Sequence, residues 1–358
     1  MKLKKLFLKS LVCVLFVSFF AACEDGHNEI LEPTERVLPR YFAAQNGKVY
    51  VTLYDGYLAC IDTTSMSIVN QVKVGRNPEG IVAANNKLYV ANSGGMDFNT
   101  ETGYDKTVSI VNANNFSVQS LEVAINPAIL AADSKGNVYL ISKGNYGDVP
   151  ATLQRIDAQT QEVTVINEVS GATYMKMYND KLYIICSQYD SNWNQTANCI
   201  VYDAVNEKVI VDKFITDGTD INSAYSISVE PVTGNVYISM SDYRNTGDMY
   251  IFSPQGKLIK QFDTKGLNPV GAFFDGSQYS YILNNGNWGS NDASLYCYNS
   301  VNGSLTDIFY NANQIKLGDI AQDMIIYGSK MYVAVSESQV IFVLNKNGLI
   351  LKTIRYRN

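Results

Sequence analysis

A short phrase centred on a tyrosine returns seven times along the chain, and this repeat constrains the fold more than any other feature. The copies read KVYVT, KLYVA, NVYLI, KLYII, NVYIS, YSYIL and KMYVA, and successive tyrosines lie 39, 50, 44, 54, 44 and 51 residues apart. A period of this length is typical of repeat architectures, in which each copy is one supersecondary unit. The seven tyrosines are Tyr50, Tyr89, Tyr139, Tyr183, Tyr237, Tyr281 and Tyr332.

Each copy contains four strand-like segments in the same order. The first segment opens near a proline, which suits the first residue of a strand because proline has no N–H to donate. A polar turn, the tyrosine segment and a connection of variable length follow. The third segment ends in Asp or Asn, whose short side chains start turns, and a fourth segment completes the unit. The prolines are Pro39, Pro78, Pro127 and Pro269.

The strand-like segments are apolar almost throughout, as in LYIIC and VIFVL. An antiparallel sheet with one solvated face alternates instead, so both faces of these sheets are expected to be covered, as in propeller blades. We predict an all-β chain, a seven-bladed β-propeller of four-stranded antiparallel blades over residues 38–358. A pair of β-sandwiches is the alternative, which seven units in phase disfavour. We expect the ring to close without a swapped strand, unless residues 28–37 add one.

The first residues have the pattern of a lipoprotein signal. Residues 1–22 combine four lysines with an apolar run too short for a membrane span. The ending FFAAC resembles a bacterial lipobox and predicts lipidation of Cys23, with residues 23–37 as a tether; an ordinary signal peptide with a chance cysteine is the alternative. Glu24 and Asp25 follow directly and resemble a surface-export signal. We expect a lipid-anchored outer-membrane protein that faces the cell exterior.

The charge of the chain argues against nucleic acid as a partner. The formal net charge is −6, and removal of residues 1–22 makes it −10. An acidic surface repels phosphate backbones.

The cysteines suit an exported protein but do not form a disulfide framework. Cys60 and Cys297 occupy matching places in their repeats and are expected to be core residues. Cys186 and Cys199 flank one predicted loop, so a disulfide between them and two free thiols both remain open.

The long connections are expected on one face of the ring. With strands ordered A to D from the axis outward, antiparallel pairing places the B–C and D–A connections at the same end. The A–B and C–D turns are short, whereas several B–C connections are long. These connections cover residues 92–107, 142–151, 187–198, 241–247 and 284–293.

These long connections carry aromatic rings and amides, including both tryptophans of the chain. Exposed aromatic rings reduce solubility, but they offer broad apolar faces at low entropy cost, and amides both donate and accept hydrogen bonds. Packing of each ring beneath its own loop is the alternative. The predicted ligand-binding residues are Arg76, Asn77, Phe98, Tyr104, Tyr146, Tyr189, Trp193, Tyr243, Arg244, Asn287 and Trp288.

The chain lacks the residues for several kinds of catalysis. Its only histidine, His27, precedes the first repeat, which excludes a Ser-His-Asp triad and histidine-based metal sites within the ring. We therefore predict a protein that is not an enzyme, although glycosidase-type chemistry by acidic residues of the long connections, here called rim acids, remains open. Calcium at a carboxylate loop also remains open, with Asx-turns favoured. The rim acids are Asp97, Asp148, Asp190 and Asp242, and the calcium candidates are Asp217, Asp220 and Asp292.

The phrases KLYVANSGG, TVSIVNANNFSVQSLEV and INPAIL resemble YncE-like propellers. LISKGNYGDVPATLQRIDAQT and NNGNWGSNDASLYCYN resemble the DUF5074-type propeller lipoproteins, the group that includes BtuG. This resemblance implies capture of vitamin B12 and related corrinoids, with transfer to a TonB-dependent outer-membrane transporter of the BtuB type. It supplies no motif that assigns individual binding residues. A glycan-binding or carbohydrate-active propeller and a protein-interaction scaffold are the alternatives.

Overall fold

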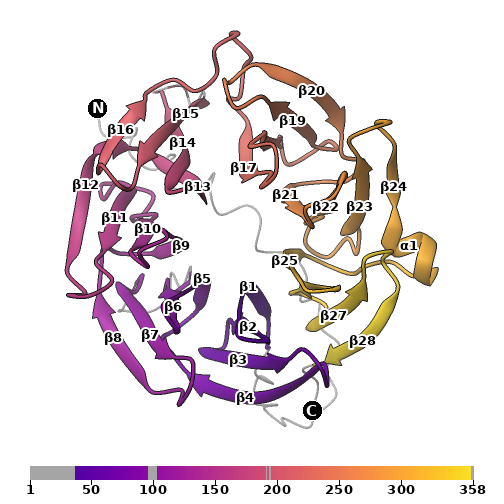
Figure 1. The fold of residues 1–358 in the computed structure, drawn as a ribbon, viewed down its shortest axis with the longest axis horizontal. Coiled ribbons are helices and arrows are strands. Elements are labelled where there is room, and N and C mark those ends of the chain that lie inside the picture. The colour runs from indigo at the N-terminus through magenta and orange to yellow at the C-terminus, as the bar shows by residue number, and fades with distance from the viewer. Residues whose placement is uncertain (1–36, 96–102, 191, 193–194, 356–358) are drawn as a thin grey trace, which may run out of the picture. The chain divides into compact units, whose positions relative to one another are not determined.

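The computed structural model describes residues 37–95, 103–190, 192 and 195–355 of the chain. Within these residues the chain forms seven sheets of four antiparallel strands, arranged as a ring (Figure 1). The fold is an all-β, seven-bladed β-propeller, as the repeat predicts. These described residues all belong to one compact unit.

Each blade consists of four strands that are consecutive in the sequence. Blade 1 contains β1 (Pro39–Gln45), β2 (Lys48–Leu53), β3 (Tyr57–Asp62) and β4 (Ser67–Lys73); blade 2 contains β5 (Pro78–Ala84), β6 (Lys87–Asn92), β7 (Thr107–Asn112) and β8 (Val118–Glu122); blade 3 contains β9 (Pro127–Ala132), β10 (Val138–Ser142), β11 (Thr152–Ile156) and β12 (Val163–Ser170); blade 4 contains β13 (Ala172–Tyr178), β14 (Lys181–Tyr189), β15 (Gln195–Asp203) and β16 (Lys208–Val211). Blade 5 contains β17 (Ala224–Val229), β18 (Val236–Met240), β19 (Asp248–Phe252) and β20 (Leu258–Asp263); blade 6 contains β21 (Pro269–Phe274), β22 (Tyr279–Asn284), β23 (Ser294–Asn299) and β24 (Leu305–Asp307); blade 7 contains β25 (Ala321–Tyr327), β26 (Lys330–Val335), β27 (Val340–Asn345) and β28 (Ile350–Arg355). A short helix, α1 (Ile308–Asn313), follows blade 6.

The first strand of every blade lies nearest the axis, and the fourth strand lies at the outer edge (Figure 1). Each first strand contacts the first strand of the next blade, including β25 and β1. The repeated tyrosines lie on the second strands, and all seven are between 0% and 7% exposed. The repeated phrase therefore corresponds to the buried second strand of each blade. No helix among the described residues has both the length and the apolar character needed to span a membrane.

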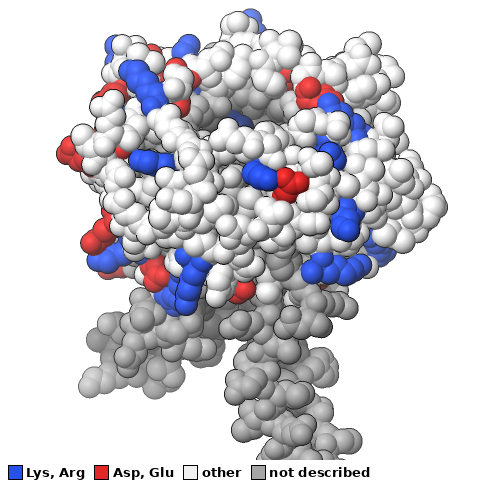
Figure 2. Space-filling model, turned by 60° about the horizontal axis from the view of Figure 1, so that its bottom comes forward, with Lys and Arg blue, Asp and Glu red and all other residues white. Residues whose placement is uncertain are grey.

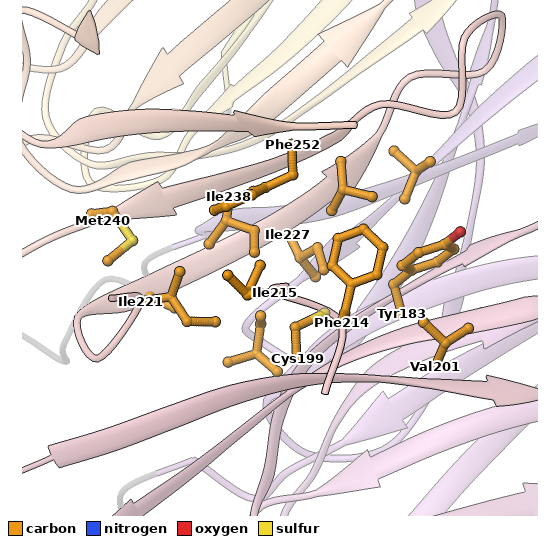
Figure 3. Close-up of a cluster of buried hydrophobic side chains, with 14 residues drawn as sticks. Tyr183, Cys199, Val201, Phe214, Ile215, Ile221, Ile227, Ile238, Met240 and Phe252 are labelled. Atoms are coloured by element: carbon orange, nitrogen blue, oxygen red, sulfur yellow. The ribbon is translucent and has the colours of Figure 1, made fainter. Parts of the chain in front are cut away.

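The blades are held together by apolar side chains packed between neighbouring sheets. Figure 3 shows one such cluster, in which Tyr183 and Cys199 of blade 4 lie beside Ile227 of blade 5. Phe214 packs edge-on against Tyr183, with 5.5 Å between the ring centroids. Burial of large side chains contributes about 1.5–3 kcal/mol each, so these interfaces are the main source of stability for the ring.

The same kind of interface closes the ring. Phe42 and Val49 of blade 1 share a buried cluster with Tyr332 and Ile341 of blade 7. All four strands of blade 7 come from one continuous segment. The prediction of closure without a swapped strand is confirmed over the described residues.

Cys186 and Cys199 are free thiols, so the disulfide considered from the sequence is wrong. In the β14–β15 ladder Cys186 pairs with Asn198, which is the residue before Cys199. Successive strand residues point to opposite faces, so the two thiols lie on opposite faces of the sheet. Cys199 accordingly packs between blades 4 and 5 and Cys186 between blades 3 and 4.

One backbone hydrogen bond recurs in all seven blades and fixes the end of the ring that carries the long connections. In six blades a residue just after the second strand, and in blade 4 Ser187 near the end of β14, donates its N–H to a carbonyl just before the first strand, at 2.8–3.2 Å. The B–C and D–A connections therefore lie at the same end, as predicted. The seven pairs are Tyr54–Leu38, Ser93–Asn77, Lys143–Asn126, Ser187–Gly171, Ser241–Ser223, Asn285–Asn268 and Ser336–Ile320.

The predicted loop over residues 187–198 is shorter in the structure. The ladder of β14 and β15 continues to the pair Tyr189–Gln195, so that most of this segment is strand. The extended hairpin raises Tyr189 above the end of the ring.

A buried asparagine connects two segments at this end of blade 2. The Asn92 side chain accepts a hydrogen bond from the Gly75 N–H at 3.0 Å and donates to the hydroxyls of Thr107 and Ser109. A Cβ at position 75 would lie 2.3 Å from the Asn92 Cγ, so this approach requires glycine. Asn92 thus satisfies buried polar groups that water does not reach.

Replacement of this side chain is expected to destabilise the ring. Asn92→Ala leaves the Gly75 N–H without its acceptor and opens a small cavity, so we expect a loss of about 2–4 kcal/mol in the free energy of unfolding. Chemical denaturation measures this loss. Asn70→Ala on the exposed face of β4 is the matched control and should change stability by less than about 0.5 kcal/mol; equal effects in the two variants would contradict the proposed role.

Candidate functional site

The B–C and D–A connections form a rim around one mouth of the ring, and two predicted ligand-binding residues brace it. Arg76 forms an ion pair with Asp105 at 3.0 Å and donates to the Gly103 carbonyl. Asn77 accepts a hydrogen bond from the Ser93 N–H through its carbonyl. Both residues therefore position the connection between β6 and β7.

Other predicted residues are divided between the surface and structural contacts. Arg244 and Trp288 are exposed, and Trp288 lies in the connection of blade 6. The Asn287 side chain accepts from Asn268 and its N–H donates to Asp292, so it shapes that connection. Phe98 and Trp193 lie outside the described residues.

The structure brings three of the predicted tyrosines together around one cavity. Tyr146, Tyr189 and Tyr243 belong to blades 3, 4 and 5, and each is between 60% and 67% exposed. Tyr174 of β13 and Tyr225 of β17 line the same cavity, whose volume is about 360 Å³. We call this site the tyrosine cavity.

Three of the five rings are in direct contact with one another. Tyr225 lies between Tyr174 and Tyr243, with centroid distances of 6.1 and 5.6 Å. Tyr104, also predicted, packs edge-on against Tyr146 at 6.2 Å. Edge-to-face arrangements at this separation are favourable, and they hold the rings in place before any ligand arrives.

Polar groups lie between the rings of the tyrosine cavity. The hydroxyls of Thr173 and Ser187 are 3.3 Å apart, and the Gln195 amide donates to Ser187 at 3.3 Å. Ser241 donates to Asn268 and accepts from the Tyr243 N–H. A ligand here would meet hydroxyl and amide groups beside aromatic faces.

Two of the exposed tyrosines have an uncommon backbone conformation. Tyr146 and Tyr243 have φ values of 55° and 63°, in the left-handed region. This region costs a non-glycine residue about 1–2 kcal/mol. The turns that impose it are built by neighbouring side chains: Asn145 accepts from the Gly147 N–H, and Asp242 from the Arg244 N–H. The strain keeps both rings at the edge of the tyrosine cavity.

Four phenols of the tyrosine cavity, those of Tyr146, Tyr174, Tyr225 and Tyr243, have raised pKa values and stay neutral at physiological pH. Burial raises the pKa of Tyr225 to about 12, with a further contribution from Tyr243. Burial also raises the pKa values of Tyr146, Tyr174 and Tyr243. These hydroxyls therefore remain hydrogen-bond donors and do not attract cations as phenolates.

An axial channel continues from the tyrosine cavity through the ring. Two further cavities, of about 390 and 490 Å³, share lining residues with each other, and the first also shares Lys143, Tyr174 and Tyr225 with the tyrosine cavity. The first strand of each blade contributes to the wall. One wall residue from each blade, in order, is Tyr41, Glu79, Ile129, Lys176, Ser226, Phe273 and Asp323.

A charged pair stands in the wall of the channel. Arg40 donates two hydrogen bonds to the Glu79 carboxylate at 2.7 and 2.9 Å. The guanidinium lies over the rings of Tyr54 and Tyr41, at 5.3 and 5.7 Å from their centroids. Charge-assisted hydrogen bonds from one guanidinium nitrogen to both carboxylate oxygens, together with cation–π contact, fix this arginine in place.

The sequence did not single out Arg40, Glu79, Tyr174 and Tyr225. The register shifts at the start of each first strand, between Pro39 and Phe42 in β1 and between Ala224 and Ser226 in β17. Such a bulge re-aims side chains. A usable signal exists: the missed residues follow the opening residue of a first strand by one or two positions.

The rim acids that the structure describes are engaged in turns. Asp148 accepts from the Asn145 amide, and hydrogen bonds lower the pKa of Asp242 to about 2. A glycosidase acid needs a raised pKa instead. The remaining candidate, Asp97, lies outside the described residues. Asp217 and Asp220 accept from the Thr219 and Asn222 N–H groups in Asx-turns. The described residues contain no cluster of three or more His, Cys, Asp or Glu side chains suited to a metal ion.

Comparison with known proteins supports the fold only. No protein-family model matches the chain, and no curated protein matches its sequence. The crystal structure of the computationally designed Ika8 protein is similar, with a TM-score of 0.57 and 10% sequence identity over 89% of this chain and 87% of that chain. The resemblance to YncE-like and DUF5074-type proteins therefore stays a prediction.

Asp323 is expected to make stability depend on pH. Burial raises its pKa from 3.8 to about 7, although the Phe42 and Met324 N–H groups and Lys176 act to lower it. The folded state therefore binds this proton more tightly than the unfolded state, and stability falls as pH rises from about 4 to about 7. Asp323→Asn should raise the melting temperature more at pH 8 than at pH 5.

The matched control is Asp212→Asn, since Asp212 is exposed after β16. It should show no such difference between the two pH values. A gain for Asp323→Asn that is the same at both pH values would contradict the shifted pKa of Asp323.

Proposed function

We propose that this chain is a non-enzymatic surface lipoprotein that captures a corrinoid at the tyrosine cavity and passes it to an outer-membrane transporter of the BtuB type. The observation that carries the proposal is the tyrosine cavity, where three exposed rings from three blades surround one opening. The predicted lipobox at Cys23 supports anchoring, and the resemblance to the DUF5074-type group supports the ligand class.

The chemistry of the tyrosine cavity suits a corrinoid. Such a ligand is a wide ring fringed by amides, so it needs aromatic faces for contact and hydroxyl or amide groups around them. Tyr146, Tyr189 and Tyr243 offer the faces, whereas Ser187 and Gln195 offer the polar groups. The ring would lie across the mouth with one edge in the cavity, because 360 Å³ does not enclose a ligand of that size.

The absence of histidine from residues 28–358 shapes the proposed mode of binding. Cobalt cannot exchange its own lower ligand for an imidazole of the propeller. The ligand would therefore be held through its periphery, by contacts that need no change at the metal.

A glycan-binding propeller is a second candidate, and the size of the tyrosine cavity favours it. A cavity of about 360 Å³ suits a ligand of one or a few sugar rings. Tyrosine faces stack on sugars as they do on other rings, and neutral phenols donate to sugar hydroxyls. The two candidates share a site and differ in the ligand.

Titration with cyanocobalamin tests the first candidate. We expect saturable binding at micromolar concentration or below, measured by calorimetry and by retention of the red colour after desalting. Tyr243→Gly should weaken binding at least tenfold, because a central aromatic anchor contributes about 2 kcal/mol or more. Glycine accepts φ of 63° without strain, so the free energy of unfolding should stay within about 1 kcal/mol of the wild-type value.

Tyr310→Ala is the matched control, because Tyr310 is an exposed tyrosine on α1 at the outer edge of the ring (Figure 1). Its affinity for cyanocobalamin should equal that of the wild type. No binding of cyanocobalamin, together with binding of glycans on an array that Tyr243→Gly removes, would replace the corrinoid with a sugar. Co-purification of a membrane partner without any small ligand would favour a scaffold.

A further inference from the structure

Two lysines without ion-pair partners line the axial channel below the tyrosine cavity. Lys143 follows β10 and lines both the tyrosine cavity and the adjoining part of the channel. Lys176 of β13 lines the channel deeper along its axis. Neither ammonium group makes a hydrogen bond or ion pair with a described residue, whereas Arg40 in the same wall is paired with Glu79.

The charged and titratable groups that face these amines come from several blades. Five of the first strands contribute such groups, while β9 and β21 contribute apolar wall residues, among them Ile129 and Phe273. Besides the two lysines, the groups are Arg40 and Tyr41 of β1, Glu79 of β5, Tyr174 of β13, Tyr225 of β17 and Asp323 of β25, together with Tyr146, Tyr189 and Tyr243 on the side of the tyrosine cavity.

We propose that the axial channel holds a binding site for a small oxyanion, a sulfate-like or phosphate-like group, between Lys143 and Lys176. Because Arg40 and Glu79 neutralise each other, the two lysines leave a net positive charge here, opposed only by Asp323. The site does not depend on the function proposed for the tyrosine cavity.

The surroundings of the amines favour an anionic ligand over water alone. Burial lowers the pKa values of Lys143 and Lys176, since protein surrounds the channel and charging each amine is costly there. An oxyanion would offset that cost through charge-assisted hydrogen bonds. The hydroxyls of Tyr174 and Tyr225 supply further neutral donors in the same wall.

The distribution of charged side chains in the channel differs from that on the outside of the protein. On the face shown in Figure 2, acidic and basic side chains are scattered among uncharged ones, and the ring is hollowed at its axis. The chain as a whole is acidic, with a formal net charge of −6. Two cations without ion-pair partners in the wall of one channel are therefore a local feature that the overall charge does not explain.

Sulfate is the probe for the test, with chloride at equal ionic strength as the reference. Sulfate stabilises proteins generally by exclusion from their surface, and this effect rises without saturation. We expect an additional saturable rise in melting temperature and saturable heat in calorimetry. The double variant Lys143→Gln, Lys176→Gln should lose at least tenfold in sulfate affinity and keep only the general effect.

Lys260→Gln is the matched control, since Lys260 is an exposed lysine on the outermost strand of blade 5. It should bind sulfate as the wild type does. If the double variant does not fold, the two single variants replace it, each with an expected loss of at least threefold. Saturable binding that is unchanged in the lysine variants, or absent from the wild type, overturns the proposal.

The pH dependence provides a second readout, because sulfate stays divalent from pH 5.5 to 8.5. Asp323 has a pKa of about 7, raised by burial, so its negative charge appears over this range. Any loss of protons from Lys143 or Lys176 as pH rises also lowers the positive charge of the channel. Sulfate affinity should therefore fall as pH rises, and Asp323→Asn should weaken the dependence; affinity that rises with pH overturns the proposal.

Competition identifies the source of the oxyanion. Cyanocobalamin carries a phosphodiester, which cobinamide lacks. Displacement of sulfate by cyanocobalamin but not by cobinamide assigns the site to a phosphate group of a larger ligand. Retention of sulfate in the presence of both corrinoids assigns it to free small anions. Corrinoid binding at the tyrosine cavity is measured separately in the same variants, so a failure of either proposal is recognised on its own.

Discussion

Apolar packing between neighbouring blades is the interaction on which the rest of the structure depends. Among the described strands none is exchanged between the first and last blades, so the contact of Phe42 and Val49 with Tyr332 and Ile341 closes the ring. Such burial is non-directional. The placement of the strands and their connections is therefore set by the sheet registers and by the seven recurring backbone hydrogen bonds. Together they hold the rim rigidly enough for rings from three blades to surround one cavity.

The fold could be predicted because the tyrosine repeat reports the buried second strand of every blade. Antiparallel alternation then placed the long connections at one end, whichever side chains they carried. Individual site residues were harder to predict. A period of two residues assigns faces along a regular strand, but each first strand opens with a bulge, and the pattern fails there. Arg40 and Tyr225 lie at such bulges, so the repeat pattern does not assign them to the channel wall or to the tyrosine cavity.

Residue type alone also did not separate a ligand contact from a structural brace. Arg76 and Asn77 have the side chains that a ligand site needs, but the structure uses them to hold the connection between β6 and β7. The difference lies in partners far along the chain, such as Asp105, which no local pattern reveals. Tyr146 and Tyr243 are different, because turns built by neighbouring side chains hold their backbones in the left-handed region while their rings stay exposed at the tyrosine cavity. Strain that persists at an exposed position is a reason to infer a role in binding.

The two proposed sites divide recognition between two kinds of force. The tyrosine cavity is lined by aromatic rings, hydroxyls and amides, so a ligand there is selected by shape, stacking and hydrogen bonds, and its affinity should depend little on salt. The lysines of the channel act by charge, which bulk salt screens over about 8 Å in physiological conditions. An acidic exterior does not draw anions in from a distance, so an oxyanion must reach the channel by diffusion through the mouth. A ligand with both a ring and a phosphate would satisfy the two sites at once, because Tyr174, Tyr225 and Lys143 belong to both cavities.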